Sequence, residues 1–168
     1  MNKEQLLKLN EDFLESLDDK SSSLLKELTK GQHPSTLVVC CSDSRVVPEK
    51  IFHSTFGDIF VIRTAGNLIN EGELASVEYG IEHLKVSLVV VLGHTHCGAV
   101  HASIHNEKGL YLSPILDRIK KNISLEKDER EASIINAQKE AEFIKSKFPN
   151  YQGEVISLLY DIETGKVS

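Results

Sequence analysis

Residues 37–45 read LVVCCSDSR, a short apolar run that ends in two cysteines, an aspartate and an arginine. The stretch LVVVLGHTHCG at residues 88–98 contains a second apolar run, which stops at a glycine and is followed by two histidines and a cysteine. Short runs rich in valine and leucine that stop at glycine or polar residues are typical of buried strands. We therefore predict two strands that each end in side chains able to bind a soft metal ion.

Strands and helices alternate along the chain around these two runs. Strands are predicted at 36–41, 58–63, 87–92 and 153–160, and helices at 48–54, 73–84, from Cys97 to about 104, from Pro114 onward, and at 134–148. Charge-rich residues 120–130 are interpreted as a solvated surface, and residues 163–166 as a turn that starts a hairpin. Strands that are apolar on both faces and separated by helices indicate an α/β fold, with a mostly parallel central β-sheet flanked by helices.

The first thirty residues form a helical arm with no chemistry of its own. Leucines from Leu6 to Leu17 recur on one side of a helical pattern, and a second helix is predicted at 21–29, with Ser21 to Ser23 as possible caps. The pattern leaves open whether the arm packs on its own domain or on a second copy. At 168 residues, the chain fits a single domain, 1–168, of which 1–30 is the arm.

Composition excludes several classes of partner. The net charge of −6 provides no broad basic surface, so neither nucleic acid nor an anionic membrane is an expected partner. No run approaches the roughly 18 apolar residues of a membrane span, and no apolar signal core follows the first residues. Three cysteines, an odd number, favour reduced thiols over a disulfide framework. These features predict a cytoplasmic protein.

The cysteines and histidine at the two strand ends suit zinc. A catalytic zinc site has three protein ligands in a tetrahedron and leaves the fourth position for water. Cys41, His94 and Cys97 make such a set, and carboxyl ends of parallel strands are where ligands gather. Adjacent strand residues point to opposite faces, so Cys40 is predicted to be a small buried apolar side chain. His96, between two ligands, is predicted to point away.

Asp43 and Arg45 follow the first strand at the same alternation as Cys41. The aspartate could be a turn former, a fourth metal ligand, a hydrogen-bond acceptor or a proton acceptor. Arg45 could hold the carboxylate in a bidentate pair, which would keep Asp43 ionised and off the metal. On this hypothesis the metal keeps an open position for water.

Four segments together resemble the β-class carbonic anhydrases. They are CSDSR at 41–45, GDIFVIRTAGN at 57–67, SVEY at 76–79 and GHTHCG at 93–98, and the similarity extends more weakly from residue 30 to residue 161. The order C-x-D-x-R followed by H-x-x-C is highly specific.

The resemblance implies a lyase that reversibly hydrates carbon dioxide to bicarbonate and a proton by zinc-bound hydroxide, with one Zn2+ per chain. It implies a homodimer or larger homo-oligomer in which the N-terminal helices pack on the partner. The residues it implies are zinc ligands Cys41, His94 and Cys97, a catalytic dyad of Asp43 and Arg45, and a substrate pocket with Gly98 and, across the dimer interface, Gln32, Phe60 and Tyr79.

Two other functions fit the same residues. Relatives in this family hydrolyse carbonyl sulfide or carbon disulfide, and the site residues alone do not separate these substrates from carbon dioxide. A non-catalytic zinc module would need Asp43 to close the tetrahedron, but then Arg45 would have no carboxylate to hold away from the metal.

Because two thiolates neutralise the charge of zinc, we expect activity to rise on the alkaline side, with Asp43 replacing hydroxide at low pH.

Overall fold

The structure, a computed structural model, describes residues 1–168 and contains two compact units, Met1–Gln32 and His33–Ser168. The smaller unit contains α1 (Lys3–Ser16) and α2 (Asp19–Leu28). Asn2 and Gln5 form a capping box at the start of α1, since each side chain accepts from the other's backbone N–H. The second helix starts two residues before its predicted start because Asp18, and not one of the serines, caps it.

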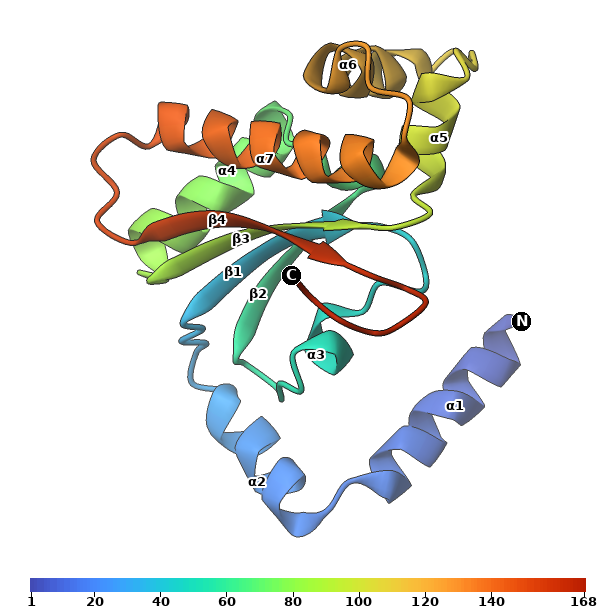
Figure 1. Cartoon of the computed structure of the whole chain (residues 1–168). Helices are drawn as coiled ribbons and strands as arrows, with labels where there is room; N and C mark the ends of the chain where they lie inside the picture. Colours follow the sequence, from blue (N-terminus) through green and yellow to red (C-terminus); the bar gives the residue numbers. More distant parts are fainter. The chain divides into compact units, whose positions relative to one another are not determined.

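The larger unit is built on one parallel sheet of four strands, confirming the predicted α/β class (Figure 1). The strands are β1 (Thr36–Cys41), β2 (Ile59–Thr64), β3 (Leu88–His94) and β4 (Glu154–Tyr160), in the order β2-β1-β3-β4. Successive strand side chains alternate between the two faces, so each face has its own apolar cluster.

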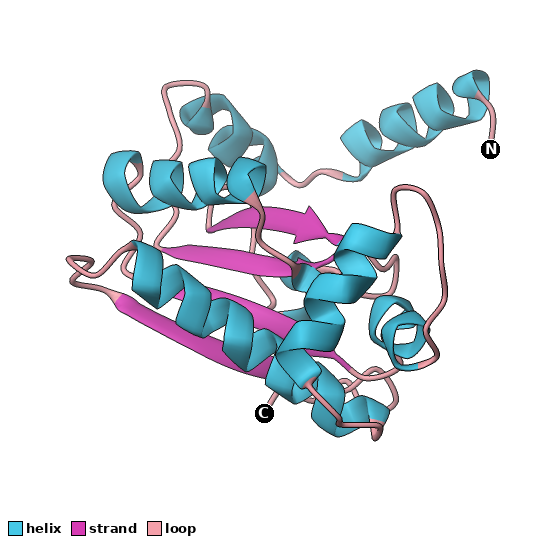
Figure 2. Cartoon of the chain, turned by 90° about the horizontal axis from the view of Figure 1, so that it is seen from above, coloured by secondary structure: helices cyan, strands magenta, loops and turns pink.

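Helices cover these two faces unequally. Leu37, Val39, Val89 and Val91 face a cluster that includes α4 (Glu71–Glu78), a π-helical turn, η2 (Tyr79–His83), and the long helix α7 (Glu129–Lys147). Figure 1 shows α4 and α7 on one side of the sheet and the short α3 (Pro48–Ile51) on the other. Figure 2 looks down on the sheet, so helices lie in front of the strands, which run side by side behind them. The remaining elements are η1 (Ala65–Asn67), α5 (Gly98–Ile104) and α6 (Ser113–Ile123).

Several predicted boundaries were wrong. β3 continues past Leu92 to His94, because Gly93 and His94 still pair with β4. The charge-rich segment 120–130 is not solely a solvated surface: it holds the end of α6, which buries Ile123, and the first residues of α7.

The predicted hairpin turn is confirmed, since residue 160 bridges Val167 in the antiparallel sense. No helix has the length and apolar content needed to span a bilayer.

Candidate metal centre

The predicted metal ligands come from the carboxyl ends of two neighbouring strands. Cys41 is the last residue of β1 and His94 the last of β3, and these strands lie next to each other. Cys97 precedes the first turn of α5. Because β2 and β3 flank β1, the connectivity reverses here, which is where parallel sheets bind ligands. The structure brings the three side chains together: all are buried, and one ligand atom from each lies within 4.8 Å of the others.

The hydrogen bonding of the His94 imidazole leaves one ring nitrogen available as a metal ligand. Its Nδ1 lies 2.8 Å from the carbonyl oxygen of Thr95, which can only accept, so Nδ1 carries the proton. The other nitrogen, Nε2, is buried without a hydrogen-bond partner in a side chain that is 0% exposed. A buried polar atom left bare is costly, whereas a metal-binding histidine commonly has its second nitrogen fixed by a carbonyl. The orphaned Nε2 therefore fits a metal ion.

The two thiols share a charge that also suits a divalent cation. A hydrogen bond from the Cys97 thiol lowers the pKa of Cys41, against the opposing effect of burial. The same hydrogen bond, with burial, raises the pKa of Cys97. The hydrogen bond between the two thiols thus favours one negative charge on the pair, and a cation would stabilise the deprotonated form of both. Two sulfurs and one imidazole are the donor set of zinc, and zinc is the cofactor that fits this site.

Gly66 provides a backbone contact to the metal centre that the sequence interpretation did not assign. Its N–H donates to Cys41 Sγ at 3.4 Å, which stabilises the thiolate. The residue has φ of 70°, and a Cβ there would lie 2.8 Å from Cδ1 of Ile119. Glycine is therefore needed both for the backbone conformation and for space beside the thiolate.

A buried polar network holds Gly66 from α7. Asn136 donates from Nδ2 to the carbonyl of Gly66 at 2.9 Å, and its Oδ1 accepts from Asn122. Glu140, 0% exposed, accepts from Asn122, from Arg118 and from the backbone N–H of residue 69. The only sequence signal for this network was a polar or charged residue on the apolar side of a helix pattern, and nothing in that pattern indicated its partner.

Asp43 and Arg45 form the predicted bidentate pair. Arg45 donates from Nε to Oδ1 at 2.9 Å and from Nη2 to Oδ2 at 2.7 Å, and its backbone N–H also donates to Oδ1. The side-chain bonds from Arg45 lower the pKa of Asp43 well below its usual range, so the carboxylate is ionised at neutral pH. Nη2 of Arg45 also reaches the carbonyl of His96, which links this loop to the segment between His94 and Cys97.

Arg63 is a second arginine that organises the same loop, and the motif that contains it did not indicate what its side chain binds. From the end of β2, its Nη2 donates to the carbonyls of Asp43 and Val46, at 2.8 and 2.7 Å. Its Nε lies 3.3 Å from the carbonyl of Cys41. These bonds satisfy carbonyls that the loop would otherwise leave unpaired, and they fix the backbone on both sides of Asp43.

Two residues next to the predicted ligands lie as expected. Cys40 is 0% exposed and packs on the opposite face with Val38 and Leu92, and burial raises its pKa to about 12. His96 is exposed, and its Nε2 pairs with Oε1 of Glu163 at 2.9 Å. Neither belongs to the Cys41 cluster.

Within one chain, the predicted pocket residues Phe60 and Tyr79 lie away from this cluster, whereas Gly98 adjoins it. Phe60 and Tyr79 lie near each other, with ring centroids 6.1 Å apart. Phe60 pairs with residue 37, four residues before Cys41, and this separation corresponds to about 13 Å along the strand. Gly98, directly after Cys97, has open space where a Cβ would lie. Gln32 is the last residue of the N-terminal unit.

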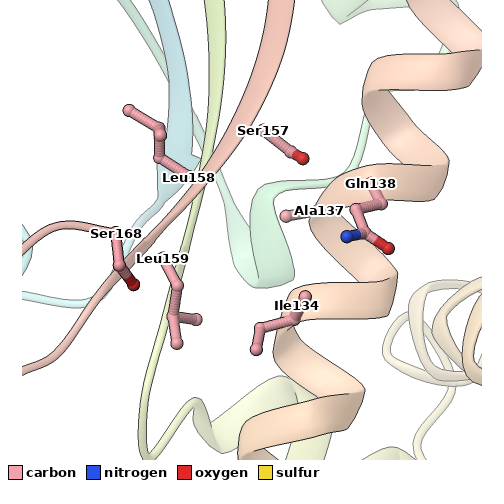
Figure 3. Close-up of a pocket in the computed structure, with 7 residues that line it drawn as sticks. All are labelled: Ile134, Ala137, Gln138, Ser157, Leu158, Leu159 and Ser168. Carbon is pink, nitrogen blue, oxygen red and sulfur yellow. The ribbon is translucent and has the colours of Figure 1, made fainter.

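A separate hollow between α7 and β4 has no comparable chemistry (Figure 3). Ile134, Ala137 and Leu159 supply apolar walls, while Gln138, Ser157 and Ser168 supply the polar atoms. Without a thiol, imidazole or carboxylate side chain, it does not compete with the strand-end cluster as a reaction site.

The fold and the site define a parallel α/β protein with a Cys2His metal centre and an arginine-held carboxylate beside it. The family model of carbonic anhydrase matches residues 36–167. The chain belongs to the carbonic anhydrase family, and its solved neighbours place it in the β class.

Relatives and solved structures agree with this assignment. A carbonic anhydrase of Synechocystis is 46% identical over 58% of this chain and 36% of its own length, and one of Candida albicans is 30% identical over 98% and 66%. The β-carbonic anhydrase CcaA superimposes with a TM-score of 0.83 at 30% identity, over 98% of this chain and 85% of that one. A tetrameric β-carbonic anhydrase of Sordaria macrospora superimposes with a TM-score of 0.81 at 26% identity, over 98% of this chain and 94% of that one. The chain spans 30% to 50% of the length of the first curated relatives it matches.

Proposed function

We propose that this chain catalyses the reversible hydration of carbon dioxide to bicarbonate and a proton, with one zinc ion held by Cys41, His94 and Cys97. The observation that supports this most strongly is the bare Nε2 of buried His94 beside two buried thiols, with one ligand atom from each of the three residues within 4.8 Å of the others. When bound, zinc acts as a Lewis acid that makes a coordinated water nucleophilic near neutral pH.

In this mechanism Asp43 orients the attacking water and accepts its hydrogen bond. Oδ1 accepts two hydrogen bonds from Arg45, whereas Oδ2 accepts one and keeps a further lone pair, so the carboxylate stays paired with Arg45 while Oδ2 binds a second donor. The lowered pKa of Asp43 keeps this acceptor available throughout the neutral range. Because Arg45 and Arg63 fix the loop at both the carboxylate and the backbone, the acceptor is positioned before substrate enters.

The substrate pocket is proposed to be completed by a second copy of the chain. Phe60 pairs with a residue four positions before Cys41 and the ring of Tyr79 lies against that of Phe60, so the two are proposed to line the pocket of the partner and not that of their own chain. Tyr79 is 45% exposed and available for such a contact. Gln32 and Gly98 are proposed as further pocket residues, Gln32 from the partner.

The proposed smallest unit is a homodimer in which the N-terminal helices pack on the partner. α1 has no buried residue, and Leu6, Leu7 and Leu14 are each more than half exposed. When a partner covers leucines on one side of a helix, the burial of their apolar surface lowers the free energy of the assembly. Association of a relative into tetramers agrees with this proposal. We also propose a cytoplasmic location, where the three free thiols would remain reduced.

A hydration assay on zinc-loaded protein tests the proposed reaction. Asp43→Asn keeps the shape of the side chain but removes its charge, and we expect it to lower turnover by about 100-fold or more. Asp117→Asn, an exposed aspartate on α6, is the matched control and should retain full activity.

The same preparation should be assayed with carbonyl sulfide and carbon disulfide. Faster turnover of either sulfur compound would replace the proposed substrate while keeping the site. Loss of zinc in Cys97→Ser is expected in either case. Tight zinc binding with no turnover of any of the three substrates would refute an enzymatic role and favour a structural zinc module.

A further inference from the structure

A second group of metal-binding side chains lies on the surface between α5 and α7. His101 and His105 are four residues apart, at the side and end of α5, and Glu129 is the first residue of α7. The spacing brings both imidazoles to one side of the helix, where their ring centroids are 4.1 Å apart and nearly parallel, at 29°. One ligand atom from each of the three residues lies within 4.8 Å of the others.

From this geometry we infer a second divalent-metal site, formed by one imidazole nitrogen from each of His101 and His105 and one carboxylate oxygen from Glu129. Two imidazoles and a carboxylate are a donor set for Zn2+, Ni2+ or Cu2+ and not for Ca2+ or Mg2+, which prefer oxygen ligands. The site does not depend on the proposed reaction, since none of these side chains belongs to the Cys41 cluster.

The hydrogen bonds of the two histidines prepare them for a metal. Nδ1 of His105 lies 2.9 Å from the carbonyl oxygen of His101, which can only accept, so Nδ1 carries the proton and Nε2 is the free donor atom. Nδ1 of His101 lies 2.6 Å from Oε1 of Glu129, so one cation could take both atoms as ligands. Tetrahedral zinc places its ligand atoms about 3.4 Å apart, so exposed side chains need only small rotations to reach it.

The location gives metal binding a measurable consequence. α5 begins directly after Cys97, and α7 carries the network that holds Gly66, so an ion here would tie together two elements that also position the first site. Figure 1 shows α5 beside the beginning of α7. A ligand that binds only the folded chain raises the unfolding temperature with concentration.

The test uses untagged, zinc-loaded protein, dialysed against excess Zn2+ and titrated separately with Ni2+ in a calorimeter. We expect a second ion per chain, and an affinity for it at least tenfold weaker in His105→Ala and in Glu129→Gln. His33→Ala, an exposed histidine elsewhere, is the matched control and should bind the second ion as the wild type does. Excess Zn2+ should raise the unfolding temperature of the wild type and of His33→Ala, but not of His105→Ala.

Far-UV circular dichroism and the first zinc equivalent show whether each variant is folded. Wild-type protein that takes up a single ion in excess Zn2+ would overturn the inference. So would a second ion whose affinity is the same in both site variants and the control, because it would then be bound elsewhere. Failure of carbon dioxide hydration would leave these results unaffected.

Discussion

Replacing Glu140 by glutamine tests whether the buried network on α7 stabilises the fold. Oε1 accepts from Nε of Arg118 and from Asn122, while Oε2 accepts from Nη2 of Arg118 and from the N–H of Ile69. A glutamine amide would replace one of these oxygens with a donor. Whichever way the amide turns, two donors lose their acceptor and the charge opposite Arg118 disappears.

The expected cost follows from these contacts. One of the two orphaned donors belongs to Arg118, whose side chain is 30% exposed and can recover a bond from water. The other, from Asn122 or from the backbone, remains buried, and such a group costs about 1–3 kcal/mol. With the weakened ion pair we expect Glu140→Gln to lose about 3 kcal/mol of unfolding free energy. For a chain of this size, that lowers the unfolding temperature by roughly 6–12 °C.

Urea denaturation at equal protomer concentration, with thiols reduced, measures this difference. Glu142→Gln is the matched control, since Glu142 lies on the same helix but is exposed and pairs only with Lys139. The control should change the free energy of unfolding by less than about 0.5 kcal/mol. If Glu140→Gln costs less than about 1 kcal/mol, the network does not stabilise the fold as argued.

Three further predictions concern the metal centre. Gly66→Ala should lower stability and zinc retention against a chelator, because its Cβ would meet Ile119 in a backbone of positive φ; unchanged retention would contradict this. The folded-state pKa of Asp43 is lowered, so its contribution to stability is complete near neutral pH and declines as pH falls below about 4. Arg45→Ala removes the hydrogen bonds that lower this pKa, so it should move the midpoint of acid unfolding, measured by circular dichroism, to higher pH. Removal of zinc by a chelator should lower the unfolding temperature of wild type but not of Cys97→Ser.

Local patterns were enough to predict the strands and to select the residues of the candidate metal centre. The apolar run before Cys41 could pack only as a buried strand, and the spacing of His94 and Cys97 limits both to one turn of chain. The two-residue spacing of Asp43 and Arg45 likewise predicted the bidentate pair, because both partners belong to one short loop. These features depend on neighbours in sequence, so the sequence contains the information.

Contacts between distant segments were decided only by the tertiary structure. β1 and β3 lie side by side because both are buried in one sheet, and this brings Cys41 to His94 across more than fifty residues. The bond from Asn136 to Gly66 spans 70 residues, and it exists because α7 packs on the face of the sheet. A polar side chain in a helix pattern does not specify which carbonyl it will meet, since packing alone selects the partner.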